Sequence, residues 1–226
     1  MSRSVWALGL FFLTACNSSK TPEKADSAPA SADEIRYLAL GDSFTIGTGN
    51  TPDQAFPARL ADRWQKAGKK VTLKNLGVNG YTTDDLSARE LPEVAPFHPT
   101  IVTLAIGAND RVHQTPLAIY RRHVSQILDD IVKAGVPAKQ IVALPQPDWS
   151  LSPAASSFGT PDTLGKDIVL FNAALKEESE KIGARYIDLY PLMHRQAEAK
   201  MIAGDGLHPN AQAHDEWAAE LVKSLP

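Results

Sequence analysis

Five short apolar runs recur along this chain, and a longer segment with helical spacing separates each run from the next. The runs cover residues 37–40, 71–73, 101–105, 141–144 and 186–189. Several of them are continuously apolar instead of alternating with polar residues, which is typical of strands buried on both faces of a parallel sheet. The alternation of strands and helices therefore predicts an α/β fold, with about five mostly parallel strands and helices on both faces of the sheet.

The segments between the runs carry apolar residues at the spacing of amphipathic helices. The expected apolar stripes are Phe56, Leu60 and Trp64; Leu117, Tyr120, Val124, Ile127 and Ile131; Leu164, Ile168, Phe171, Leu175 and Ile182; and, after His208-Pro209-Asn210, Trp217 and Leu221. Glycines at 68, 135 and 183 are expected to end the first three helices. Thr115 as N-cap followed by Pro116 predicts the start of the second helix.

The first fifteen residues have the composition of an export signal. Arg3 precedes an apolar run over residues 5–13, which is shorter than the roughly 20 residues that a membrane-spanning helix needs. The next residues, Leu13-Thr14-Ala15-Cys16, resemble a bacterial lipobox, in which the cysteine is lipidated and becomes the mature N-terminus. Cys16 is the single cysteine of the chain. We therefore expect a lipoprotein signal peptide over residues 1–15; the alternative is an ordinary secretory signal with an incidental cysteine.

Residues 16–33 are expected to comprise the lipidated Cys16 and a flexible tether, because they are rich in Ser, Ala, Pro, Lys and Asp and have no apolar periodicity. An acylated cysteine on such a linker would hold the rest of the chain at a membrane of the bacterial cell envelope, on the periplasmic or the outer face. Residues 34–226 are long enough for one domain with a substantial core. The choice between inner and outer membrane and the oligomeric state stay open.

Charge and spacing exclude some classes of partner. The net charge is −3 and the pI is about 6.1, without a basic stripe, which argues against nucleic acid as a partner. Asp42, Asp110, Asp205 and His208 could in principle converge on a metal ion, but no His-x-His or His-Glu-x-x-His spacing supports a metal site. We expect neither a metal nor another cofactor.

A serine and an Asp-His pair stand in positions that suit nucleophilic catalysis. Ser43 follows the first apolar run, in Gly41-Asp42-Ser43-Phe44, and Asp205 lies three residues before His208. A serine hydroxyl attacks carbonyl groups poorly unless an oriented imidazole accepts its proton. Pro209 restricts His208 to an extended backbone, so a tight turn would bring the Asp205 carboxylate to one ring nitrogen. Each motif alone is ordinary turn or cap chemistry, whereas both in one chain indicate a hydrolase.

Two more candidate residues follow the second and third apolar runs. Gly80 lies in a glycine-bearing loop over residues 75–83, where it could let a backbone N–H approach a substrate oxygen or could serve turn geometry alone. Asn109, in Gly107-Ala108-Asn109-Asp110, could cap a turn or donate its side-chain amide to an oxyanion. Active sites of parallel sheets lie beyond the carboxyl ends of the strands, so Ser43, Gly80 and Asn109 are expected at one edge.

Taken together, four ordered blocks resemble the SGNH (GDSL-type) hydrolase family. They are Gly41-Asp42-Ser43-Phe44-Thr45-Ile46-Gly47, residues 75–80, Gly107-Ala108-Asn109-Asp110, and Asp205-Gly206-Leu207-His208-Pro209-Asn210. The resemblance implies a flavodoxin-like three-layer sandwich, with Ser43 as nucleophile, His208 as general base and Asp205 orienting it. It also implies an oxyanion hole made of the Ser43 and Gly80 N–H groups and the Asn109 side chain, with no cofactor. Phe44 replaces the usual leucine of the family, a change expected to leave the chemistry intact and to alter the neighbouring acyl pocket.

The resemblance implies ester hydrolysis through an acyl-enzyme, and the loop at residues 145–159 bears on the substrate. Trp149, Leu151 and Phe158 are available there to contact an apolar chain, although they could instead pack onto the sheet. We expect a lipid or other acyl ester, as for a lysophospholipase, thioesterase or arylesterase. A carbohydrate or peptidoglycan O-acetyl esterase is the alternative, since Trp149 could stack on a sugar ring, and a non-catalytic lipid-binding lipoprotein is a further one. The acyl-chain length stays open.

Overall fold

A single parallel sheet organises the protein. The computed structural model describes residues 34–225 together with the isolated Met1; the expected signal peptide, Cys16 and tether otherwise lie outside the described residues. The strands are β1 Glu34–Gly41, β2 Lys70–Asn75, β3 Ile101–Ala105, β4 Ile141–Ala143 and β5 Arg185–Tyr186. They pair in parallel in the order β2-β1-β3-β4-β5. The expected α/β fold with five strands is confirmed.

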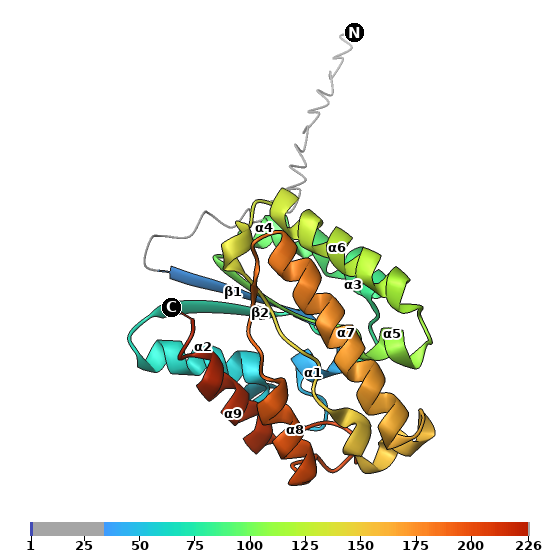
Figure 1. Cartoon of the computed structure of the whole chain (residues 1–226). Coiled ribbons are helices and arrows are strands. Elements are labelled where there is room, and N and C mark those ends of the chain that lie inside the picture. Colours follow the sequence, from blue (N-terminus) through green and yellow to red (C-terminus); the bar gives the residue numbers. More distant parts are fainter. Residues whose placement is uncertain (2–33, 226) are drawn as a thin grey trace.

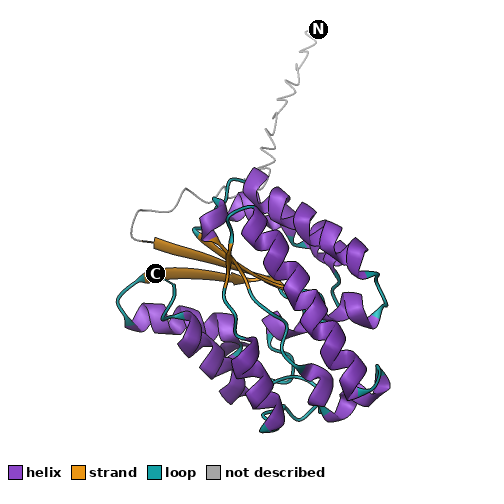
Figure 2. Ribbon diagram, viewed as in Figure 1, coloured by secondary structure: helices purple, strands orange, loops and turns teal. Residues whose placement is uncertain are grey.

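Helices occupy most of the remaining chain (Figure 2). The α-helices are α1 Ser43–Ile46, α2 Phe56–Lys66, α3 Thr83–Arg89, α4 Val94–Phe97, α5 Ala108–Val112, α6 Leu117–Lys133, α7 Pro161–Lys181, α8 Tyr190–Glu198 and α9 Ala211–Leu221. The 3₁₀ helices are η1 Pro52–Gln54, η2 Leu91–Glu93, η3 Ala138–Gln140, η4 Trp149–Leu151 and η5 Pro153–Ser157. No helix within residues 34–225 is long and apolar enough to cross a membrane.

Alternate side chains of the central strands enter two separate cores. On one face, Leu38, Leu40, Val102 and Leu104 pack with side chains of α6 and α7. On the other face, Ile35, Tyr37, Ala39 and Ile101 pack with side chains of α2, α8 and α9. Because a strand directs successive side chains to opposite faces, strands buried on both sides carry apolar residues at adjacent positions. Figure 1 shows helices on both sides of the sheet, which is the expected three-layer arrangement.

Several element boundaries differ from the sequence expectation. Helix α6 is capped by Pro116 and begins at Leu117, so the assignment of Thr115 as N-cap was wrong. The reason is that the Thr115 N–H donates to the Asp110 carbonyl, which keeps Thr115 in the turn after α5. Strand β5 ends at Tyr186, before the expected residue 189, because the Asp188 carboxylate accepts the N–H of Tyr190 at the start of α8. The loop at residues 145–159 contains η4 and η5.

The strand order places the crevice at the carboxyl ends of β1 and β3. After β1 the chain crosses to β2 on one side, and β3 returns to the other side of β1. In open α/β sheets, ligands bind where the strand order reverses in this way. After β1, Ser43 is the first residue of the short helix α1, and after β3, Asn109 is the second residue of the short helix α5.

Candidate active site

A sharp turn presents Ser43 at the end of β1. Gly41 has a φ of 151°, and a Cβ there would lie 2.2 Å from the Ala105 carbonyl oxygen, so only glycine fits. Asp42 caps α1 by accepting the Phe44 N–H on Oδ1 at 3.0 Å. Ser43 is therefore the first residue of a helix, where its own N–H has no intrahelical acceptor and is available to a substrate oxygen.

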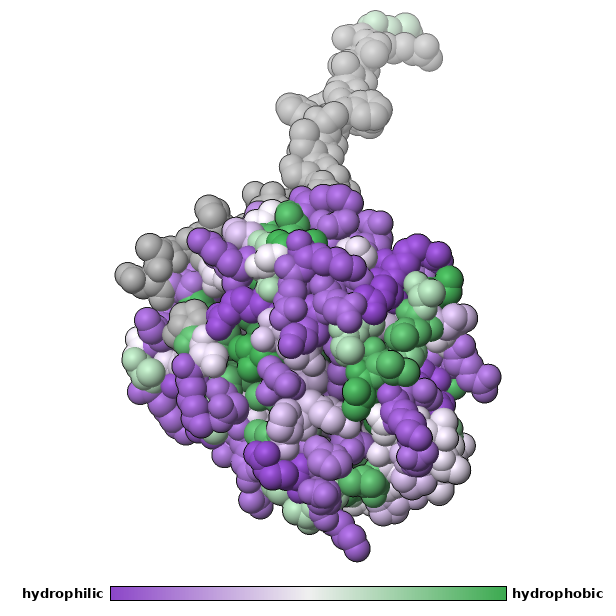
Figure 3. Space-filling model, viewed as in Figure 1, coloured by the Kyte–Doolittle hydropathy of each residue, from purple (hydrophilic) through white to green (hydrophobic). Residues whose placement is uncertain are grey.

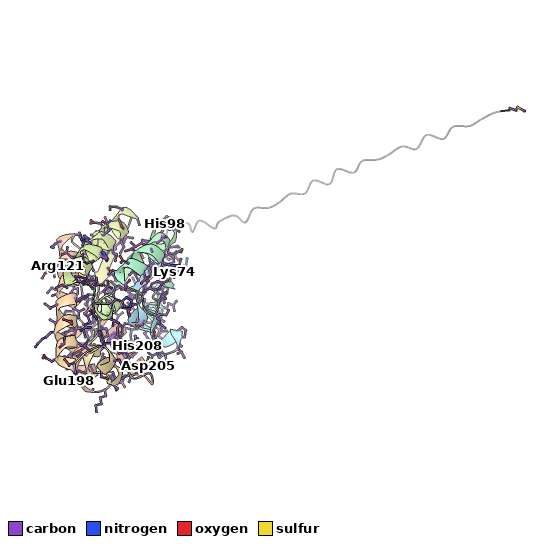
Figure 4. All side chains as sticks on the ribbon, turned by 90° about the vertical axis from the view of Figure 1, so that its right-hand side faces the viewer. Lys74, His98, Arg121, Glu198, Asp205 and His208 are labelled. Atoms are coloured by element: carbon purple, nitrogen blue, oxygen red, sulfur yellow. The ribbon has the colours of Figure 1, made fainter. Side chains whose placement is uncertain are left out.

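His208 is oriented by Asp205. The Nδ1 atom of His208 lies 2.7 Å from Oδ2 of Asp205, and Figure 4 shows the two residues side by side. Oδ1 of the same carboxylate accepts the backbone N–H groups of Leu207 at 2.9 Å and His208 at 3.0 Å. With Nδ1–H donated to the carboxylate, Nε2 carries the lone pair and can accept a proton.

The charge on Asp205 is favoured by these contacts. Partial burial acts to raise the pKa of Asp205, but the N–H groups of Leu207 and His208 and the imidazole together outweigh burial and lower the pKa below its usual range. Gly206, with a φ of 74°, permits the turn, and its N–H donates to the Ala203 carbonyl at 3.1 Å. The turn over residues 203–208 thus holds an ionised carboxylate against the imidazole.

Ser43 and His208 line one small cavity. Its volume is about 80 Å³. The lining residues are Ser43, Phe44, Ala108, Asn109, Val112, Trp149, Phe158, Leu207 and His208. Within residues 34–225 no hydrogen bond joins the Ser43 hydroxyl to His208, and catalytic hydrogen bonds commonly tighten only when substrate is bound. The cavity walls are mostly apolar, with the serine, the imidazole and one amide as polar groups.

Asn109 reaches the cavity with a donor to spare. One N–H of its side-chain amide donates to the Tyr81 carbonyl at 3.0 Å, which fixes the amide and leaves the second N–H free to donate. The next residue, Asp110, accepts the Thr83 N–H at 3.0 Å and also the Thr83 hydroxyl. These contacts tie α5 to the loop over residues 75–83, so Asp110 shapes the loop.

Gly80 stands farther out than the other candidates. It is exposed, has a φ of 82°, and does not line the 80 Å³ cavity. The closest approach in its loop is instead made by Gly77. A Cβ on Gly77 would lie 2.7 Å from the Ile46 N atom and 2.9 Å from the Asp42 carbonyl oxygen. Gly77 therefore lets the loop pack directly against the turn that carries Ser43.

Two of the three aromatic and apolar candidates in the loop at residues 145–159 meet at the cavity. Trp149 is buried and donates Nε1–H to Gln146 Oε1 at 3.0 Å, and the Phe158 ring lies edge-on to it at 6.0 Å. Leu151 does not line this cavity. It belongs to a larger and more open groove of about 790 Å³ beside α7, where Asp148 pairs with His194. Figure 3 shows hydrophobic surface on the side of the molecule that carries α7.

Three buried acidic side chains lie beneath the turn, and sequence reasoning missed one of them. Burial, opposed in part by the Phe44 N–H and helped by the nearby Asp110 carboxylate, raises the pKa of Asp42 to about 7. Burial likewise raises the pKa of Glu90 to about 8 and raises that of Asp110. Glu90 had no motif to mark it. Among residues 34–225 no cluster of three or more His, Cys, Asp and Glu side chains could hold a metal ion.

Comparisons with known proteins agree with this architecture. Residues 39–216 match the model of the GDSL-like Lipase/Acylhydrolase family. The arylesterase of Vibrio mimicus is 26% identical over 199 residues, which cover 87% of this chain and 90% of that protein. Thioesterase 1/protease 1/lysophospholipase L1 of Escherichia coli (strain K12) is 26% identical over 203 residues, covering 87% and 86%. The crystal structure of the psychrotrophic esterase EstA from Pseudoalteromonas sp. superposes with a TM-score of 0.68 at 18% identity, covering 84% of this chain and 95% of that one.

Proposed function

The chain belongs to the GDSL-like lipase/acylhydrolase family, and from that premise we propose that it hydrolyses acyl esters through a Ser43-His208-Asp205 triad. The observation that carries the proposal is the single cavity lined by Ser43, His208 and Asn109, with the imidazole held by Asp205 at 2.7 Å. Acyl transfer needs a nucleophile, a base and an oxyanion donor, and all three line this one small cavity.

The proposed reaction proceeds in two steps. Ser43 Oγ attacks the ester carbonyl carbon while His208 Nε2 accepts the serine proton. The resulting oxyanion is bound by the Ser43 N–H and the Asn109 amide, with the Gly80 N–H, which stands outside the cavity lining, as the third proposed donor. The C–O bond to the leaving group then breaks, and His208 returns the proton to the departing oxygen. Water next attacks the acyl-enzyme, with His208 again accepting a proton, and the acid leaves as the Ser43 hydroxyl is restored. Asp205 stabilises the imidazolium formed in each step.

The size of the cavity bears on the acyl group. At about 80 Å³, the cavity is well below the roughly 300–1,000 Å³ of pockets that hold drug-sized ligands, so it suits a small acyl group. The apolar walls, which include Phe44, Trp149 and Phe158, favour an apolar acyl chain over a polar one, and the small volume favours a short chain over a long one. We therefore favour short-chain esters with an apolar or aromatic leaving group, close to the arylesterase activity in the name of the Vibrio mimicus relative.

The same volume supports a second candidate. An acetyl group fits a space of this size, so an O-acetyl ester of a carbohydrate or of peptidoglycan would also satisfy the cavity. Trp149, which lines the cavity beside Ser43, could then contact the sugar ring of such a substrate. The leaving group distinguishes the two candidates, because only the first requires an apolar alcohol or thiol.

Hydrolysis of p-nitrophenyl esters of graded chain length by the full-length chain tests the proposal. The wild type should turn over acetate to butyrate fastest and take up a fluorophosphonate probe, while Ser43→Ala should do neither and should keep its melting temperature. Ser156→Ala removes an exposed serine of η5 and should behave as the wild type. Residual turnover in Ser43→Ala would remove Ser43 from the mechanism, and a maximum at long chains would return the assignment to lipid esters.

Anchoring at the envelope is a separate proposal. We infer from Leu13-Thr14-Ala15-Cys16 that Cys16 is lipidated after removal of residues 1–15, that residues 16–33 form a tether, and that residues 34–226 form the hydrolase domain in the bacterial envelope. Wild type expressed with a clickable fatty acid should be labelled and partition into detergent. Cys16→Ala should lose both properties and keep its esterase activity, whereas labelling of Cys16→Ala would contradict the assignment.

A further inference from the structure

Glu90 reaches from the end of α3 to the strand that leads to the nucleophile. Its side chain is 2% exposed, and Oε2 accepts the backbone N–H of Gly41 at 2.9 Å. Gly41 is the last residue of β1 and lies two positions before Ser43. Glu90, which is distant in sequence, therefore accepts the last N–H of β1, at the point where the turn to α1 begins.

Asp42 makes the second carboxyl contact with this turn. It is 1% exposed, and its Oδ1 accepts the Phe44 N–H at 3.0 Å while its carbonyl accepts the Ile46 N–H at 3.0 Å. Glu90 therefore holds the residue before Asp42, and Asp42 holds the helix after it. Ser43 lies between these contacts.

Each of the two carboxyl groups has one oxygen left over. Oε1 of Glu90 and Oδ2 of Asp42 are both buried and have no hydrogen-bond partner within the described part of the chain. No lysine, arginine or histidine of residues 34–225 makes an ion pair with either group. Two ionised carboxylates in such a site would be two unpaired buried charges, which is costly, whereas one retained proton supplies a donor that the orphan oxygens lack.

The other titratable groups around this pair do not neutralise it. Asp110 on α5 faces Asp42 and adds like charge. Tyr120 on α6 also faces Asp42 and Asp110, and burial together with these two acids raises its pKa well above the usual value, so it stays uncharged. His123, also on α6, acts to lower the pKa of Asp110. His123 pairs with Asp84 and forms no ion pair with Glu90 or Asp42, so within residues 34–225 no cation neutralises the pair.

We propose that Glu90 and Asp42 share a proton and together form a carboxyl clamp that positions the turn carrying Ser43. Glu90 contacts neither substrate nor reacting atoms, so it is a positioning residue, and the inference rests on the proposed role of Ser43. The clamp works when at least one of the two groups is protonated. Loss of the proton places two like charges beneath the nucleophile and loosens the turn.

The pKa values of about 8 for Glu90 and about 7 for Asp42, both raised chiefly by burial, agree with a proton held at neutral pH. A raised pKa means that the folded protein keeps a proton that the unfolded chain has already released above pH 4.5 or so. The pair therefore contributes most to the free energy of unfolding at acid pH. This contribution falls as the pH rises from about 4.5, and the fall ends near pH 8, where the folded pair ionises as well.

Glu90→Gln in the full-length chain tests the clamp. The amide oxygen can accept the Gly41 N–H, and the amide nitrogen supplies permanent N–H donors in place of the shared proton, so no titratable proton is needed. At pH 6 its kcat on a short p-nitrophenyl ester should be within about twofold of wild type. Between pH 6 and pH 9 the ratio of variant to wild-type kcat should rise about threefold or more, and the difference in melting temperature should grow by about 3 °C or more in favour of the variant.

Glu178→Gln is the matched control. Glu178 is also buried, at 6% exposure, but it pairs with Lys181 at 2.7 Å and Arg121 at 3.0 Å. Its neutralisation should lower the melting temperature at pH 9, the opposite sign. Glu90→Leu removes the acceptor for Gly41 and should lower kcat about tenfold at every pH with little change in KM.

Parallel pH profiles of wild type and Glu90→Gln, in both kcat and melting temperature, would overturn the clamp. So would wild-type kcat in a folded Glu90→Leu variant. Failure of the proposed esterase function would look different, because the wild type would then take up no fluorophosphonate at Ser43. In that case the melting profiles would still decide whether the two acids share a proton.

Discussion

The aromatic ring of Phe44 lies against the imidazole of His208, with the ring centroids 5.2 Å apart and the planes inclined by 56°. Phe44 follows the proposed nucleophile on α1, so one short helix carries both Ser43 and a wall of the imidazole site. The same ring lines the 80 Å³ cavity. A single side chain thus limits the space for the acyl group and restricts the orientation of the base.

Phe44→Leu should therefore change both properties. Because the leucine is smaller and cannot make the aromatic contact with His208, kcat on p-nitrophenyl acetate should fall about 2–10-fold, in line with the value of such a contact. The preferred acyl chain should lengthen as the cavity grows. Steady-state kinetics across the ester series would measure both effects, and an unchanged chain-length profile would contradict the role of Phe44 as a cavity wall.

Asn109→Ala should lower kcat about 10²–10³-fold with little change in KM, since the proposed amide donor acts on charge that develops only in the transition state. The truncation also removes the donor to the Tyr81 carbonyl, so a melting curve should accompany the kinetics. A loss confined to KM would mean that Asn109 binds the ground state of the substrate and does not stabilise the oxyanion.

Phe158→Ala should open the acyl cavity while leaving most of the core in place, because Phe158 lines the cavity yet is 37% exposed. The ratio of kcat/KM for octanoate to that for acetate should increase. Leu151→Ala is the matched control: Leu151 is similarly exposed, at 42%, but lines the separate 790 Å³ groove. Equal shifts in the two variants would argue that the groove and the cavity act as one site.

His214 should make the protein sensitive to mild acid. It is fully buried on α9, its Nδ1 accepts the Phe56 N–H at 3.2 Å, and burial, together with the charge of His208, lowers its pKa to about 4. In the unfolded chain His214 binds a proton near pH 6.5, whereas in the folded protein it stays neutral until about pH 4. The free energy of unfolding should therefore fall by about 3 kcal/mol as the pH drops across this window.

Urea denaturation at pH 7, 6, 5 and 4 would measure this slope. His214→Gln should flatten it, even if the variant is less stable throughout. His113→Gln, which replaces an exposed histidine, should keep the wild-type slope. If His214→Gln and wild type lose stability in parallel between pH 6.5 and pH 4, the acid sensitivity originates elsewhere.

Much of the architecture could be predicted from the chain alone because the relevant signals are local. Residues 101–105 are apolar except for Thr103, as suits a strand buried on both faces, and they form β3 at those bounds. Asp205 and His208 lie only three positions apart, so their spacing and Pro209 indicate a contact between carboxylate and imidazole. Short helices such as α1 and α5 escaped prediction, since four or five residues are too few to show a helical period.

The tertiary structure alone decided which distant residues meet. The bond between Glu90 and Gly41 joins positions 49 residues apart, and nothing near Glu90 in the sequence marks its partner. Trp149 and Leu151 are two residues apart in one loop, yet Trp149 lines the 80 Å³ cavity and Leu151 lines the separate 790 Å³ groove. Apolar periodicity records that a side chain is buried, whereas the identity of its neighbours depends on how helices pack across the sheet. The sequence by itself therefore determined the fold class and the candidate residues, and the packing of helices on the sheet determined the cavity and the carboxyl pair beneath Ser43.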